Sequence, residues 1–245
     1  KLPTTISVLR ITNPRAPELR AQLQKDPTLL LKHTKDVDTT KLLLQLKADP
    51  NTKNKFGYTP LHLASSAGKV DTVRLLLQSN ADPNTKNRDG YTPLHEASII
   101  GQMETARLLL QFKVDPNTKN KHGTTSLHWA SRFGRIDMVR LLLQSKVDPN
   151  TKNKDGYTPL HWASNHGHLD TVRLLLQFNV DPTTKDKDGD TPLHWASLCG
   201  QVDVARLLLQ FKVDPNTKNK DGNTPLELTS NPEIKQLLGS NMQIE

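Results

Sequence analysis

The sequence repeats itself every 33 residues, and this period restricts the possible folds more than any other feature. Glycines recur at this spacing from Gly57 to Gly222, and histidines recur at it from His62 to His194. The phrase Asp-Pro-Asn-Thr-Lys-Asn begins at Asp49 and returns in later units with few changes. Periods of roughly 20–50 residues are typical of solenoids, in which each unit packs against its neighbours. We therefore expect a stack of similar units.

Each unit predicts two short helices joined by a turn. Thr59 precedes Pro60, and a hydroxyl N-cap followed by proline at the first helical position favours a helix start. The first helix then covers residues 60–66, Gly68 ends it, and a second helix covers Val70 to Gln78. Helices of fewer than about 12 residues are marginal alone, so neighbouring units must bury one another's apolar faces. The predicted fold class is an all-α solenoid.

The Gly-x-Thr-Pro-Leu-His motif, the Leu-Leu-Leu run and the 33-residue period together resemble the ankyrin repeat family, over about residues 24–239. The resemblance implies L-shaped units, in which antiparallel helix pairs alternate with β-hairpin-like fingers made by the Asp-Pro-Asn-Thr-Lys segments. It implies that each repeated histidine hydrogen-bonds backbone and fixes a turn. It also implies that variable residues of the first helices and fingers line a concave groove.

The two ends of the chain depart from the repeat pattern. Asp26 and Pro27 stand near the N-terminus where the Thr-Pro-Leu-His motif would lie, and Glu227 replaces the histidine near the C-terminus. Solenoids need such atypical ends to cover their exposed core. The predicted divisions are residues 1–23 as an extension or an extra capping helix (about Pro17 to Gln24), 24–56 as a degenerate repeat, 57–221 as five complete repeats, and 222–245 as a truncated capping repeat and tail.

Nothing in the sequence predicts catalysis, a cofactor or a metal site. The repeated histidines occur once per unit, and packed helices lie roughly 8–10 Å apart, which is too far for shared metal ligation. The same spacing separates Cys199 from His166, so a thiol–imidazole pair is not expected. We also find no glycine-rich phosphate loop. We expect that the chain is not an enzyme.

Composition indicates where the protein resides. Cys199 is the single cysteine, so no internal disulfide can form, and an intracellular location, cytoplasmic or nuclear, is favoured. No apolar run approaches the roughly 20 residues that a membrane-spanning helix needs. We expect a monomer without a membrane span.

The net charge of +8 suggests a polyanionic partner, but most of the charge is balanced locally. The fingers carry twelve basic residues and twelve aspartates, and the second helices carry acid–base pairs three residues apart. A stripe of lysines after the second helices remains, at Lys113, Lys146 and Lys212. This stripe is an alternative binding site for nucleic acid or an acidic membrane, although no aromatic residues interleave with it. A nucleic-acid partner is therefore the less favoured prediction.

Variation between units points to the more favoured site. Leu61, Ala64 and Ser65 recur almost unchanged in the later first helices, whereas the opposite stripe changes in every unit. The predicted partner-binding residues are Tyr91, Glu96, Ile99, Ile100, Trp129, Arg132, Phe133, Tyr157, Trp162, Asn165, His166, Trp195 and Leu198.

Trp, Tyr and Arg are the residues that most often carry interface energy. We therefore expect a scaffold that binds another protein or a peptide in the groove. Two alternatives stay open: the tryptophans only pack between first helices, or the stack is a spacer for a flanking domain.

Overall fold

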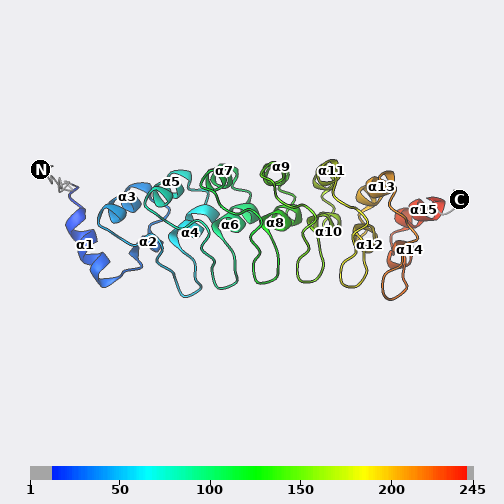
Figure 1. Ribbon diagram of the computed structural model, residues 1–245, viewed down its shortest axis with the longest axis horizontal. Helices are drawn as coiled ribbons and strands as arrows, with labels where there is room; N and C mark the ends of the chain where they lie inside the picture. Colours follow the sequence, from blue (N-terminus) through cyan, green and yellow to red (C-terminus); the bar gives the residue numbers. More distant parts are fainter. Residues whose placement is uncertain (1–12, 242–245) are drawn as a thin grey trace, which may run out of the picture.

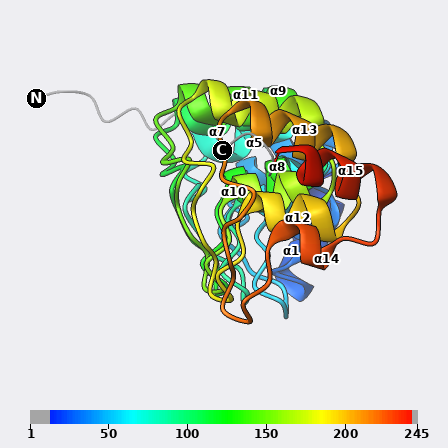
Figure 2. The ribbon, with the colours of Figure 1, turned by 90° about the vertical axis from the view of Figure 1, so that its right-hand side faces the viewer.

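The computed structural model describes residues 13–241, so residues 1–12 of the predicted N-terminal extension and residues 242–245 of the predicted tail lie outside it. Helix pairs stack along one axis, with the two ends of the chain at opposite ends of the stack (Figure 1). Viewed along that axis, the units superimpose and the fingers gather on one side (Figure 2). No β-strand occurs within the described residues, and the predicted all-α solenoid is confirmed.

The helices form two rows (Figure 1). The first helices are α2 (Leu29–Lys32), α4 (Pro60–Ser66), α6 (Pro93–Ile100), α8 (Ser126–Arg132), α10 (Pro159–Asn165), α12 (Pro192–Leu198) and α14 (Pro225–Leu228). The second helices are α3 (Val37–Gln45), α5 (Val70–Gln78), α7 (Met103–Gln111), α9 (Ile136–Gln144), α11 (Leu169–Gln177), α13 (Val202–Gln210) and α15 (Pro232–Asn241). The helix bounds predicted from Thr59, Pro60 and Gly68 are confirmed by α4 and α5. We call the loops between a second helix and the next first helix the fingers.

The ends of the stack bury apolar residues against their neighbours. The helix expected near Pro17 is α1 (Ala16–Lys25), which packs against α3 and buries Ala16 and Leu19. At the other end, α15 packs against α13 and α14 and buries Ile234 and Leu238 completely.

One hydrophobic core runs the length of the stack. The recurring first-helix residues are completely buried, as at Leu61 and Ala64, and so are Val73 and Leu76 of the second helix. Small alanine and serine side chains let neighbouring first helices approach closely, and each of these helices packs on the next. Because each unit buries only its neighbours' faces, the units keep a constant spacing.

The recurring histidines tie each unit to the next. The Thr59 backbone N–H donates to His62 Nδ1 at 3.1 Å, and His62 Nε2 lies 2.9 Å from the carbonyl oxygen of Tyr91 in the following finger. Burial lowers the pKa of His62 to about 4, so the ring is neutral and donates its Nε2 proton to that carbonyl. The same bonds recur at the later histidines, as the resemblance implies; these are His95, His128, His161 and His194.

Finger lysines add a second set of inter-unit bonds. Lys152 Nζ donates to the Lys185 carbonyl at 2.8 Å, and Lys185 Nζ donates to the Lys218 carbonyl at 2.9 Å. The equivalent lysines of three earlier fingers, at positions 53, 86 and 119, make the same contact. The expected acid–base pairs of the second helices are mostly open, because within residues 13–241 only Glu104 and Arg107 come within 4 Å, at 3.9 Å. The finger lysine bonds, in contrast, are made in five fingers and link each of these to the next.

Candidate interaction groove

Four of the variable side chains form a continuous cluster of rings across three consecutive units. Tyr91 lies in the finger before α6, Trp129 and Phe133 at α8, and Trp162 on α10. The ring centroids of Trp129 and Trp162 are 5.1 Å apart, and Trp129 lies 5.8 Å from Tyr91 and 6.0 Å from Phe133. We call Tyr91, Trp129, Phe133, Trp162 and the arginine they surround, Arg132, the aromatic cluster. The stack thus brings together residues that are up to 71 positions apart in the sequence.

Arg132 places a positive charge among these rings. Its guanidinium carbon lies 5.3 Å from the Trp162 ring centroid, 5.5 Å from that of Trp129 and 5.9 Å from that of Phe133. Such cation–π contacts orient the guanidinium without neutralising its charge. No acidic side chain within residues 13–241 comes within ion-pair distance of Arg132. The cluster is therefore an apolar surface with an unneutralised cation.

Trp195 occupies the same position of its unit as Trp162 but lies differently. Its Nε1 donates to Asp186 Oδ2 at 2.9 Å, and its ring meets Tyr157 edge-on at 5.4 Å. Asp186 stands where the other fingers have an asparagine, such as Asn153, so this bond is particular to one unit. That exception to the repeat is the signal that sequence reasoning missed.

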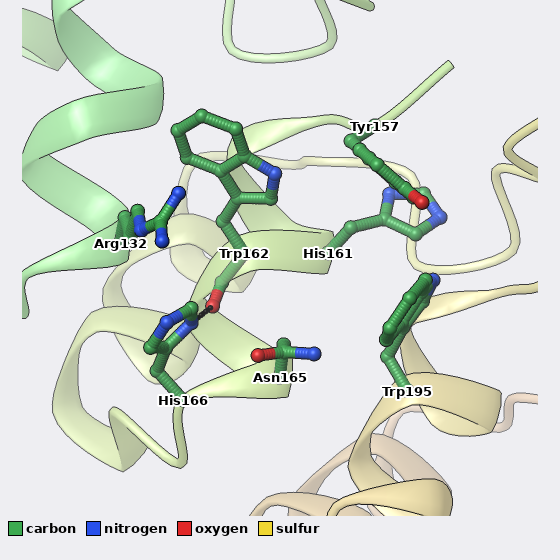
Figure 3. Close-up of a pocket in the computed structure, with 7 residues that line it drawn as sticks. All are labelled: Arg132, Tyr157, His161, Trp162, Asn165, His166 and Trp195. Carbon is green, nitrogen blue, oxygen red and sulfur yellow. Dashed lines mark hydrogen bonds between the residues drawn. The ribbon is translucent and has the colours of Figure 1, made fainter. Parts of the chain in front are cut away.

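A cavity opens between Trp162 and Trp195. Its volume is about 240 Å³, and its lining residues are Arg132, Tyr157, His161, Trp162, Asn165, His166 and Trp195. Figure 3 shows Arg132 and Trp162 on one side of this space and Tyr157 and Trp195 on the other. Because Trp162 lies against Trp129 while Trp195 lies against Tyr157, the two indoles are held apart. Six of the predicted binding residues therefore share this cavity; the buried His161 was not among the predictions.

The rim of the cavity is polar. His166 Nδ1 lies 3.0 Å from the Trp162 carbonyl oxygen, and Asn165 Nδ2 donates to Cys199 Sγ at 3.4 Å. Burial raises the pKa of the Cys199 thiol, which disfavours the nucleophilic thiolate. In the described part of the chain, no three His, Cys, Asp or Glu side chains group as a metal site would require.

Several predicted residues in the cluster and beside it are exposed apolar groups. Leu198 is 51% exposed, Ile100 is 45% exposed and Phe133 is 42% exposed, whereas Ile99 and the three tryptophans are half-buried. The tryptophans therefore pack between first helices and also leave part of each ring accessible. Phe56, which is 55% exposed in the finger before α4, was not among the predicted binding residues, although its position changes from unit to unit.

Glu96 sits near the N-terminal side of the cluster in a half-buried position. Burial raises its pKa to about 7, and a hydrogen bond from Tyr58 opposes that shift. A carboxyl with this pKa is only partly ionised at neutral pH. Glu96 therefore adds less negative charge to this face than its formal charge suggests.

The lysine stripe lies elsewhere. Lys113, Lys146 and Lys212 are exposed just after the second helices, in a different row from the aromatic cluster. Each has a left-handed backbone, with φ of 59°, 60° and 57°, as their position after the helix predicts. Asn179 takes the same position between Lys146 and Lys212, so the stripe is interrupted.

Comparison with known families agrees with this architecture. A family model described as ankyrin repeats in three copies matches residues 28–120, 79–153, 127–219 and 179–240. No curated protein matches the sequence. Among residues 13–241, none of the helices combines the length and apolar character that crossing a membrane requires.

Proposed function

Because the chain belongs to the ankyrin repeat family, we propose that it binds a partner protein or peptide on the surface formed by its first helices and fingers. Ankyrin repeats are generally protein–protein interaction modules, and proteins built from them are typically non-enzymatic scaffolds. The proposal assigns the contact to the units that contain α6, α8, α10 and α12.

The observation that carries this proposal is the aromatic cluster. Its rings are partly exposed, they come from neighbouring units, and they surround one arginine. Contiguous apolar surface of this kind is uncommon on a protein that has no partner. Tryptophan, tyrosine and arginine at the centre of an interface often account for most of its binding energy.

Affinity capture with a matched control tests the proposal. The bait is the full chain, compared with a Phe133→Ala/Trp162→Ala variant and a Phe112→Ala/Phe178→Ala variant. Phe112 and Phe178 are exposed phenylalanines after the second helices, away from the cluster. We expect a partner that the first variant loses and the second keeps, with affinity reduced at least tenfold in titrations of the recovered partner.

Thermal unfolding of both variants separates lost contact from lost fold. If the cluster variant captures as well as the wild type, the proposed surface is wrong. Equal capture by all three baits would favour the alternative of a spacer, whose contacts lie outside these residues.

A second, independent proposal concerns polyanions. It rests on the exposure of Lys113, Lys146 and Lys212 at one register position. Heparin retention with a steep salt dependence, abolished by changing these three lysines to glutamate, would support it. Passage through the column at low salt would contradict it.

A further inference from the structure

We propose that the cavity between Trp162 and Trp195 receives an apolar side chain of an extended peptide segment, and that an acidic residue beside it in the peptide pairs with Arg132. The inference rests on the proposed function and deepens it, because it states the chemistry of the partner. It predicts a recognised motif in which Asp or Glu lies close to an aromatic or large aliphatic residue.

The shape and lining of the cavity favour an apolar side chain. A cavity of roughly 150 Å³ lined by apolar groups accepts benzene. The space between Trp162 and Trp195 is larger, at about 240 Å³, and has two indoles and the ring of Tyr157 in its walls. An inserted ring or branched aliphatic chain would contact these faces and remove them from water, which is the favourable term in such binding.

Arg132 supplies the charge complementarity. Its guanidinium is held beside Trp162, at one wall of the cavity, by three rings. It has no carboxylate partner within residues 13–241. A guanidinium matches a carboxylate through two parallel hydrogen bonds, and an arginine already oriented by aromatic rings loses little freedom when it forms them. The missing acceptor is therefore expected on the partner.

Aspartates of the neighbouring fingers act on Tyr157 at the opposite wall, which gives the site a direction. Burial raises the pKa of the Tyr157 phenol, and the charges of Asp186, Asp155, Asp188 and Asp190 raise it further. An acidic residue would thus be repelled at the Tyr157 side and attracted at the Arg132 side. The acid of the motif should lie at the Arg132 end of the bound segment.

The same charge distribution disfavours a polyanion at this cavity. Nucleic-acid binding needs several cations that follow a run of phosphates. Here one arginine lies at one wall, and finger aspartates act on Tyr157 at the other, so a chain of phosphates would meet repulsion within the length of the cavity. A short segment with one carboxylate fits this pattern better.

Hydrogen-bonding groups on the floor suit an extended backbone. Figure 3 shows the Asn165 amide and the His166 ring beside the space, with Asn165 between His166 and Trp195. Amide and imidazole groups can bond the N–H and C=O groups of an extended segment, which has no internal partners for them. These bonds would orient the segment across the first helices.

Selection from a displayed random peptide library is the first test. The full chain, an Arg132→Glu variant and an Arg140→Glu variant are used as targets; Arg140 is exposed on α9, outside the cavity. We expect the wild type and Arg140→Glu to enrich peptides with Asp or Glu within a few residues of an aromatic or large aliphatic residue. Arg132→Glu should not enrich them. Failure to enrich any peptide, or enrichment without a preference for acids, overturns the inference.

Titration of one enriched synthetic peptide gives the quantitative test. Fluorescence anisotropy should show roughly tenfold or more weaker binding for Arg132→Gln, and a similar loss when the peptide's acid becomes an amide. The two losses should not add, because they remove the same contact. Replacing that acid by lysine should restore part of the binding to Arg132→Glu. Additive losses, or no loss for Arg132→Gln, contradict the inference.

Indole signals locate the bound peptide. In proton–nitrogen NMR spectra, the Nε1 signals of Trp162 and Trp195 should shift more than that of Trp129, which does not line the cavity. If Trp162→Ala abolishes binding while Arg132→Gln leaves it unchanged, the groove function stands and the acidic motif is wrong. If the peptides also bind the Phe133→Ala/Trp162→Ala variant normally, both proposals are wrong.

Discussion

The two faces of the first helices differ in how much they vary between units and in how deeply they are buried. The face toward the core repeats nearly unchanged, and its leucine, alanine and histidine side chains are almost completely buried in α4, α6, α8, α10 and α12. The other face changes in every unit and keeps its tryptophans half-buried. One residue type illustrates the contrast, since His161 is buried and holds two backbone segments, whereas His166, five positions later, is exposed.

The repeated face holds the backbone that positions side chains of the variable face. His128 Nε2 lies 2.9 Å from the carbonyl of Tyr157, and the Tyr157 side chain lines the cavity. The structural histidine therefore positions backbone that carries a predicted binding residue. We expect changes on the repeated face to cost stability and changes on the variable face to cost affinity, and the following tests compare the two.

The largest effect on stability should come from lowering the pH. The pKa values of His62, His95, His128 and His161 are lowered by burial to about 4, from an ordinary value near 6.5. Because the folded state disfavours the charged rings, the stability that the neutral rings contribute is complete above pH 6.5. It is lost as the pH falls from there toward 4. Over that interval, each ring should lower the free energy of unfolding by about 1.4 kcal/mol for every unit by which the pH falls. Urea unfolding followed by circular dichroism at several pH values measures the loss.

Glu96 should act in the opposite direction. Its pKa is raised to about 7 in the folded state, so its contribution is complete below its ordinary pKa of 4.5 and is lost as the pH rises toward 7. A Glu96→Gln variant should therefore lose the decline in stability between pH 6.5 and 7, and its stability should rise slightly more steeply between pH 4.5 and 6.5, where Glu96 opposes the histidines. A stability that does not vary between neutral pH and the pKa of the buried histidines would contradict the assigned role of those rings.

A smaller effect is expected from single histidine substitutions on the two faces. His128→Ala removes bonds to Thr125 and Tyr157 and leaves a cavity, so it should lower the free energy of unfolding by about 3 kcal/mol. His166→Ala, on the exposed face, should change it by less than about 0.5 kcal/mol. Thermal and urea unfolding compare the two variants. Equal losses would mean that the distinction between the faces is wrong.

Two tryptophans offer a finer comparison. Trp195 Nε1 donates to Asp186, whereas Trp129 Nε1 is buried and has no hydrogen-bond partner in the described part of the chain. Trp195→Phe should therefore cost about 1–2 kcal/mol more than Trp129→Phe, because it leaves a buried carboxylate oxygen without its donor. Urea unfolding midpoints of the two variants provide the measurement. The reverse order would show that ring packing, not the indole bond, determines how Trp195 lies.

The smallest effect concerns the left-handed lysines. Lys146 has φ of 60°, a conformation that glycine adopts without steric cost. Lys146→Gly should raise the free energy of unfolding by about 0.5–1 kcal/mol, since relief of strain exceeds the extra freedom of glycine in the unfolded chain. Asn80→Gly is the control and should gain less, because asparagine tolerates this conformation. A lower melting temperature for Lys146→Gly would contradict the assignment of strain.

Much of the fold could be predicted because its signals are local. A hydroxyl before proline begins α4, a glycine ends the turn after it, and a register position places Lys146 in a left-handed conformation. The finger lysine bonds could not be predicted. Lys152 reaches a carbonyl of residue 185, and the same side chain could equally have stayed in water.

The candidate site, like the fold, could be predicted from the sequence only in part. Comparison of the units was enough to select Trp129, Trp162 and Trp195 as equivalent positions on one face. It could not predict that the first two would touch while the third would turn toward Asp186. Side-chain orientation depends on contacts with residues of the next unit, and periodicity carries no information on rotamers.

By itself the sequence determined the repeat, the helix bounds and the face on which the units differ. These follow from capping, turn chemistry and hydrophobic spacing, which act within a unit or between identical neighbours. Only the tertiary structure decided that Arg132 lies among three rings, with no carboxylate of residues 13–241 at ion-pair distance, and that a cavity separates Trp162 from Trp195. The reason is that both features arise between units that are not identical, where the orientation of each side chain depends on its particular neighbour.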